Sequence, residues 1–205
     1  YGFPVTDSSG QFSLQIPDSV TAAMPSAAGW IEAYPRRLTL PPLTKQTIRL
    51  LARPPQGLPD GEYWSRITIS AKGGAIPVSS ADTTGIRIGL SLEVRSIIPL
   101  IYRKGTLQTG ISVGPITTQL RGDSLIVRAR LERQGTAAYV GTARGTLVDG
   151  RERAVATFEQ PVAVYYDAEP AFTLAIGGQP AGTYRLRVEL KSDRSDIAPD
   201  LLLRA

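Results

Sequence analysis

The sequence predicts an all-β protein with two immunoglobulin-like β-sandwich domains in tandem. Apolar and polar residues alternate over short stretches bounded by Gly, Pro and Asp, and apolar residues almost nowhere recur at helical spacing. The length of 205 residues fits two sandwiches of roughly 100 residues each. A short turn motif that ends in tyrosine also occurs once in each half, which favours two domains over one large one.

The repeated motif is PDGEY at residues 59–63 and PAGTY at residues 180–184. In immunoglobulin-like sandwiches, a tyrosine at the start of a late strand bonds its hydroxyl back to the chain at a corner. One such corner in each half predicts two sandwiches, whereas two unrelated Gly-x-Tyr turns are the simpler alternative. Alternation stops near Lys104, so we expect domains at 1–103 and 104–205, the first incomplete at its start.

Individual strands follow from the alternation and from turn residues. The turns at 58–61 (LPDG) and 148–151 (VDGR) combine residues that favour tight reversals. The Ala-rich stretch 19–30 contains Pro and Gly, and we interpret it as a loop. The expected strands are 46–51, 64–70, 85–94, 97–102, 124–132, 154–158, 162–166, 171–176 and 183–190.

Composition removes most catalytic machinery. The chain has no cysteine and no histidine, so thiol nucleophiles, disulfides and imidazole acid–base pairs are excluded. The net charge is +5, but Lys and Arg stand singly between apolar residues, as at 184–188, which is typical of a solvent-facing strand. We therefore expect no nucleic-acid binding. No apolar run approaches the roughly 18 residues of a membrane span, so we expect a soluble chain without membrane insertion.

Two motifs imitate functional sites. Residues 110–114 (GISVG) match the G-x-S-x-G pattern of hydrolases, but Ser112 has no histidine to act as its base and no helix pattern follows. A serine–lysine pair is the remaining catalytic alternative. Residues 121–123 (RGD) match a cell-adhesion tripeptide, yet a Gly-Asp turn is expected before the strand that follows.

Two acidic pairs and two tryptophans complete the candidates. Asp193 with Asp196, and Asp149 with Glu152, lie in charged turns where neighbouring arginines neutralise them. Trp30 and Trp64 could form a sugar-stacking face, but tryptophan beside a sandwich strand is more often part of the core. We therefore expect no enzyme activity, no metal site and no cofactor.

The segment with a functional argument is the long alternating stretch 85–94. Continued through 97–102 after a possible kink at 95–96 or at Pro99, it exceeds an average strand of about five or six residues. Either its aliphatic side chains fill their own sandwich, or the strand projects as an edge that pairs with another chain. The aliphatic face comprises Ile86, Ile88, Leu90, Leu92 and Val94.

Several segments together resemble the PapD-like periplasmic pilus-assembly chaperones. In the first half these are WIEAYP, LTLPP, QTIRL, LPDGEYWSR and IPLIYR, at residues 30–35, 38–42, 46–50, 58–66 and 98–103. Weaker similarities in the second half are LERQG at 131–135 and VAVY at 162–165. The resemblance covers nearly the whole chain in the family's order.

This resemblance implies donor-strand complementation, in which residues 86–94 complete the fold of a secreted, pilin-like β-rich subunit. It also implies a periplasmic or otherwise extracytoplasmic location and an outer-membrane usher as a further partner. Because the chain begins at Tyr1, we expect the signal peptide to lie outside it. Tyr1 already aligns inside the family's first domain, so we expect the family's first strands to be missing, with truncation, disorder and a divergent branch as the alternatives.

The family holds a subunit's terminal carboxylate with an arginine on its first strand and a lysine on the donor strand. Here Pro99 stands near the lysine position, so Arg95, Arg103 and Lys104 are the candidate anchors. The rival hypothesis is a structural or adhesive surface protein whose two sandwiches are spacers.

Overall fold

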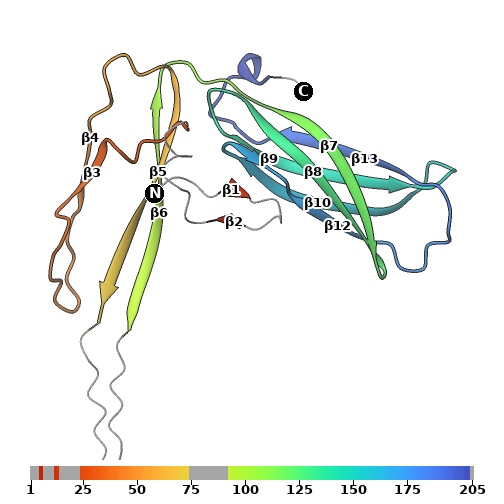
Figure 1. Ribbon diagram of the computed structural model, residues 1–205, viewed down its shortest axis with the longest axis horizontal. Coiled ribbons are helices and arrows are strands. Elements are labelled where there is room, and N and C mark those ends of the chain that lie inside the picture. Colours follow the sequence, from red (N-terminus) through yellow and green to blue (C-terminus); the bar gives the residue numbers. More distant parts are fainter. Residues whose placement is uncertain (1–4, 7–11, 14–23, 74–91, 204–205) are drawn as a thin grey trace, which may run out of the picture.

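The computed structural model describes residues 5–6, 12–13, 24–73 and 92–203, and it shows an all-β chain. Within these ranges the helical structure is one short 3₁₀ turn, η1 (Pro199–Leu201). Figure 1 shows two hairpins on one side and a layered β-structure on the other. We call residues 24–104 the first half and residues 105–203 the second half.

The second half is a β-sandwich of two antiparallel sheets (Figure 1). In one sheet β8 is central, with β7 on one edge and β12 and the short β11 on the other. In the other sheet β9 lies between β10 and β13. The strands are β7 (Thr109–Arg121), β8 (Ser124–Gly135), β9 (Tyr139–Val148), β10 (Ala154–Val164), β11 (Asp167–Ala168), β12 (Ala171–Ala175) and β13 (Arg185–Ser192).

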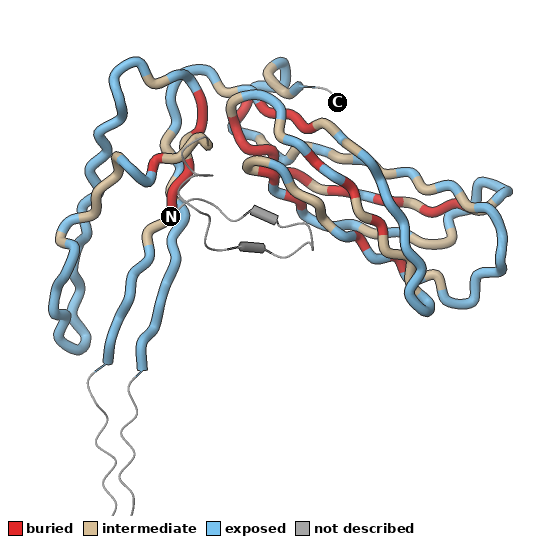
Figure 2. Tube along the Cα trace, viewed as in Figure 1, coloured by how far each residue is buried: buried red, intermediate tan, exposed pale blue. Residues whose placement is uncertain are grey.

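Alternate side chains of these strands form the core between the two sheets. On β8, Val127, Ala129 and Leu131 are buried while their neighbours are less so, which is the alternation expected of a strand with one covered face. Phe158 of β10 and Phe172 of β12 stack across the sheets with centroids 4.6 Å apart. Figure 2 shows this buried layer running through the sandwich.

The first half consists of two separate hairpins in the described residues. Strand β3 (Ile31–Tyr34) pairs with β4 (Arg49–Ala52), and β5 (Gly61–Lys72) pairs with β6 (Glu93–Lys104). The short strands β1 (Val5–Thr6) and β2 (Phe12–Ser13) also pair. These pieces do not amount to a second closed sandwich, so the division into two domains stays a prediction.

Trp64 buries the base of β5 against the second half. It is 0% exposed and lies against Tyr165 and Tyr166, each at 5.4 Å between ring centroids and in an edge-on arrangement. On its other side the Trp64 backbone exchanges hydrogen bonds with Pro25 and Ala27. The prediction that Trp64 belongs to a core is therefore confirmed.

Both predicted tyrosine corners are present. The hydroxyl of Tyr63 donates to the carbonyl of Pro59 at 2.9 Å, and that of Tyr184 donates to the carbonyl of Pro180 at 2.7 Å. Each bond spans four positions, from the start of a strand back across its turn. The repeated motif thus forms the same local structure twice.

Some strand boundaries differ from the prediction. Residues 154–158 and 162–166 were expected to form two strands, but β10 runs continuously through Pro161, which pairs with Thr142. Because β10 lies at a sheet edge, a proline that cannot donate a hydrogen bond is tolerated there. Strand β6 likewise keeps one register past Ser96 and Pro99, so the expected kink is absent.

Candidate functional site

Strand β6 is an edge strand in the part of the chain that the structure describes. It pairs residue by residue with β5 from Glu93 to Lys104, and no described strand pairs with its other edge. An edge strand presents backbone N–H and C=O groups that a further strand can pair with. We call residues 68–72 together with 93–97 the outer arm, and all of these residues are exposed.

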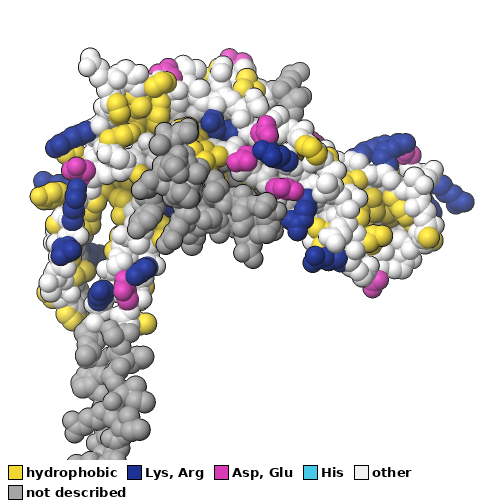
Figure 3. Space-filling model, in the orientation of Figure 1, with side chains coloured by type: hydrophobic (Ala, Val, Ile, Leu, Met, Phe, Trp, Pro, Cys, Tyr) yellow, Lys and Arg dark blue, Asp and Glu magenta, His cyan; other side chains and the backbone are white. Residues whose placement is uncertain are grey.

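Apolar side chains follow β6 along most of its length. Leu92 is 61% exposed and Val94 51% exposed, and the exposed aliphatics continue with Ile97, Ile98 and Ile101. The predicted positions Ile86, Ile88 and Leu90 lie outside the described residues. Large yellow areas on the hairpin side of Figure 3 show how much apolar surface this half presents.

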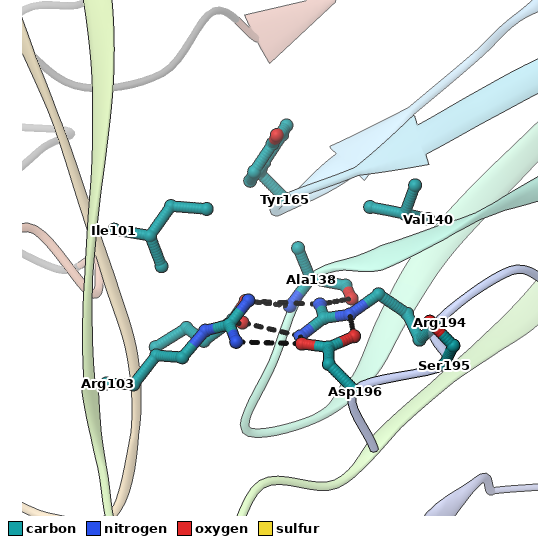
Figure 4. A pocket seen from close by; sticks show the side chains of 9 residues that line it. Ile101, Arg103, Ala138, Val140, Tyr165, Arg194, Ser195 and Asp196 are labelled. Atoms are coloured by element: carbon teal, nitrogen blue, oxygen red, sulfur yellow. Dashed lines mark hydrogen bonds and ion pairs between the residues drawn. The ribbon is translucent and has the colours of Figure 1, made fainter.

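A buried ion-pair network lies at the base of the arm (Figure 4). The side chain of Glu62, on β5, is fully buried and accepts a hydrogen bond from Arg194 at 2.6 Å and one from the backbone N–H of Ala138 at 3.0 Å. Arg103 of β6 lies 3.1 Å from the same carboxylate and 2.8 Å from Asp196. The network therefore joins the hairpin to the second half.

The electrostatics of this network favour the charged forms. Hydrogen bonding by Arg194 is the main cause that lowers the pKa of Asp196 to about 2. Burial by itself would lower the pKa of Arg194, but hydrogen bonds to Asp196 and Glu62 outweigh it and raise that pKa. Asp196 and Arg194 are therefore both ionised at neutral pH.

A shallow cleft of about 400 Å³ opens over the network. Ile101 and Arg103 line it from β6, and Val140, Tyr165 and Arg194 line it from the second half (Figure 4). The cleft thus combines apolar walls with a floor of paired charges. Glu62, Arg103, Arg194 and Asp196, which form this floor, are paired with one another.

The three predicted anchor residues occupy different places. Arg95 lies on the outer arm and bonds Glu93 at 2.9 Å. Arg103 belongs to the buried network, and Lys104 donates to the carbonyl of Leu58 beside Asp60. The structure thus brings Arg103 and Lys104 to the base of the hairpin and leaves Arg95 near its outer end. Whether any of them anchors a carboxylate stays a prediction.

Sequence reasoning did not identify Glu62 or Arg194 as site residues. The two stand 132 positions apart, and nothing in their local sequence indicates that they meet. It did predict that Arg151, Arg153 and Arg194 neutralise the neighbouring carboxylates. Arg194 pairs with Asp196 at 2.8 Å and Arg153 with Asp149 at 2.7 Å. Glu152 pairs instead with Arg185 and Arg187, from a distant part of the sequence. Among the described residues, no group of three acidic side chains is placed to hold a metal ion.

The two motifs that resemble functional sites, at residues 110–114 and 121–123, have structural roles. Ser112 bonds the carbonyl of Glu132 and the side chain of Gln134, at 3.5 and 3.1 Å. Residues 121–123 form the turn from β7 to β8, with Gly122 at a φ of 54°, as predicted. In the ranges the structure covers, no helix has the length and apolar character needed to cross a membrane.

No known protein-family model, curated protein or solved structure matches this chain.

Proposed function

We propose that this protein is a non-catalytic, extracytoplasmic chaperone or chaperone-like protein that binds secreted β-rich subunits through β6. The observation that carries the proposal is the aliphatic edge strand itself, with Leu92 and Val94 more than half exposed beside an edge that no other described strand pairs with. Backbone pairing along such an edge supplies affinity, and the alternate side chains supply specificity. The resemblance to PapD-like chaperones supports the same assignment.

The energetics require several aliphatic side chains. Each one that a partner buries contributes about 1.5–3 kcal/mol, while association costs roughly 4–15 kcal/mol. Leu92, Val94 and Ile98 lie on one face of this segment, and the predicted contact positions Ile86, Ile88 and Leu90 lie outside the described residues. Four or five such contacts suffice where one or two would not. An usher in the outer membrane is the second proposed partner.

The rival function is a structural or adhesive protein in which the strands act as spacers. It requires the aliphatics of residues 86–94 to be buried within the chain. The exposure of Leu92 and Val94 favours strand donation over that alternative.

Strand donation is tested by capture from an extracytoplasmic extract of the native source. The parent protein is compared with Leu92→Glu/Val94→Glu, and with Leu40→Glu/Leu43→Glu as a control that places the same two charges at exposed leucines between β3 and β4. We expect a small β-rich partner with the parent and the control, and none with the double variant. Hydrogen exchange of the β6 amides should slow in the complex. A partner that the double variant still captures as well as the parent does would favour the spacer function.

A further inference from the structure

The β3–β4 hairpin presents apolar side chains on both of its faces. Leu50 and Leu51 are neighbours on β4 and point to opposite faces of the hairpin, yet they are 49% and 47% exposed. A polypeptide that packed on one face would therefore leave the other uncovered. The exposed large apolar side chains of this segment are Tyr34, Leu38, Leu40, Leu43, Ile48, Leu50 and Leu51.

The most exposed of these side chains lies at the end of the hairpin. The N–H and the hydroxyl of Thr44 both donate to the carbonyl of Pro41, at 3.3 and 2.7 Å, and so close a tight turn. Leu43 lies within this turn at a φ of 60° and is fully exposed. A leucine in this left-handed conformation is uncommon, because its Cβ crowds the backbone. A strained and fully exposed leucine is unfavourable in the free chain, which points to a binding role.

The base of the hairpin is held in place. Trp30 lies edge-on against Tyr63 and Tyr102, with ring centroids 6.0 and 4.8 Å apart. The N–H of Arg53 donates to the carbonyl of Trp30 at 2.8 Å. Figure 1 shows the hairpin extending away from this base. The apolar tip is thus carried on a fixed support.

The hairpin is also basic. Residues 33–59 contain no Asp or Glu, and in Figure 3 dark blue side chains lie among yellow ones along this hairpin. The basic side chains, all exposed, are Arg36, Arg37, Lys45, Arg49 and Arg53. Arg36 lies 3.8 Å from Glu32, whereas the other four form no ion pair with any acidic residue that the structure describes. Their charge is therefore available to an anionic partner.

A groove of about 500 Å³ lies where β3 ends. It is lined by Tyr34, Pro35, Arg36 and Arg37. Tyrosine rings favour the boundary between lipid and water, and guanidinium groups bind phosphate through paired hydrogen bonds. The groove thus combines the two kinds of group that a phospholipid headgroup would contact.

We propose that the β3–β4 hairpin docks on the surface of an anionic lipid bilayer. Leu40 and Leu43 enter the interface, and the basic side chains behind them bind lipid phosphates. A lipid phase surrounds the tip and covers both faces of the hairpin at once. Apolar insertion and attraction to anionic lipid act together in binding of this kind, and the hairpin lies on the bilayer without crossing it. The proposal does not depend on β6 or on the function proposed above.

Cosedimentation with vesicles tests the docking. The 205-residue chain is mixed with vesicles of phosphatidylglycerol and phosphatidylcholine, or of phosphatidylcholine alone. We expect binding to the anionic vesicles, weaker at higher salt because salt screens the charges. Leu40→Glu/Leu43→Glu should weaken it at least tenfold, or about 1.4 kcal/mol, whereas Leu92→Glu/Val94→Glu on the other hairpin should not. Equal binding of both vesicles, or of both variants, would overturn the proposal.

Leu43→Gly separates a loss of binding from a loss of folding. Glycine adopts a positive φ without strain, so the melting temperature should stay equal or rise. Vesicle binding should nevertheless weaken by about fivefold, since one buried leucine side chain is lost. Leu120→Ala, at an exposed leucine on β7, is the control and should bind as the parent does. Parental binding by Leu43→Gly would contradict insertion of the tip.

A charge control distinguishes the hairpin from the net charge of the chain. Lys45→Gln/Arg49→Gln and Arg121→Gln/Lys191→Gln each remove two exposed positive charges, and only the first pair should weaken vesicle binding. Equal losses would mean that net charge alone attracts the chain. Polyglutamate is titrated in parallel. A hairpin that binds polyglutamate but no vesicles would assign the basic surface to an acidic polypeptide, and either result would contradict the proposal.

Discussion

At the scale of single residues, Glu62 is the most consequential side chain in the described chain. It is 1% exposed, and a carboxylate is buried at such depth only when its charge is matched. Arg194, Arg103, Ala138 and Trp64 all contact its oxygens. Removing its charge would leave the buried guanidinium of Arg194 without its nearest anionic partner.

We expect Glu62→Gln to lower the free energy of unfolding by about 3 kcal/mol, because it removes one charge of a buried ion pair and leaves the other charge buried. The matched control is Glu159→Gln, which breaks the exposed pair with Arg144 and should cost less than about 1 kcal/mol. Urea titration of both variants measures the difference. Equal, small losses would show that the buried network contributes little.

Asp196 gives the network a pH dependence. Its pKa is lowered in the folded protein from 3.8 to about 2, chiefly by the Arg194 hydrogen bond, so folding favours the ionised form. This contribution is complete above about pH 4 and is lost as the pH falls toward 2. Melting temperatures measured from pH 6 to 2 should therefore fall more for the parent than for Asp196→Asn. Parallel curves would contradict the assignment.

Whether the contact of a residue can be predicted depends on how close its partner lies in the sequence. The corners at Tyr63 and Tyr184 were predicted because donor and acceptor lie four positions apart within one motif. The Glu62 network was not predicted because its members come from distant parts of the chain. Local chemistry is therefore readable in the sequence, whereas contacts created by the fold are not.

At the scale of elements, alternation predicted the strands that bury one apolar face. It identified much of β5, β6, β8, β12 and β13, but not β7 or β9. Both are rich in Gly and Thr, as in TGISVGPITTQLR of β7 and YVGTARGTLV of β9. Strand β9 is held because β10 and β13 pair with both of its edges, and β7 is held because the long strand β8 pairs with one of its edges. Pairing with neighbours outweighs their weak intrinsic preference.

Close packing around β9 makes a glycine test informative. A Cβ at Gly141 would lie 2.2 Å from the backbone oxygen of Lys191, so β13 would have to move. We expect Gly141→Ala to destabilise the protein by about 1–3 kcal/mol. Gly150→Ala, in the turn after β9 with no atom within 4 Å, is the control and should be neutral or slightly stabilising. Thermal unfolding compares the two, and a neutral Gly141→Ala would contradict this packing.

At the scale of the whole molecule, the two halves share a small but well-bonded junction. Trp64 packs against Ala138 and Tyr165, and the N–H of Glu62 donates to the carbonyl of Thr136 at 2.9 Å. The junction therefore contains packing, backbone pairing and the ionic network. Such a junction should make the halves unfold together.

Both tryptophans lie in the first half, while most paired strands lie in the second. Tryptophan fluorescence and far-ultraviolet circular dichroism should therefore report separate halves, and we expect their urea midpoints to coincide in the parent. In Arg194→Gln the fluorescence transition should move to lower urea. Separate midpoints in the parent would show that the junction does not couple the halves.

The junction also fixes the orientation of the β5–β6 hairpin relative to the second half. Twelve paired residues carry β6 away from its base, a lever of roughly 40 Å at about 3.3 Å per residue. A rotation of about 5° at Glu62 would move the far end by about 3.5 Å, most of the 4.7–4.9 Å that separates neighbouring strands. A small rotation at Glu62 is thus magnified along the hairpin. Substitutions of Glu62 would therefore make the position of the outer arm less well defined, although they do not contact it.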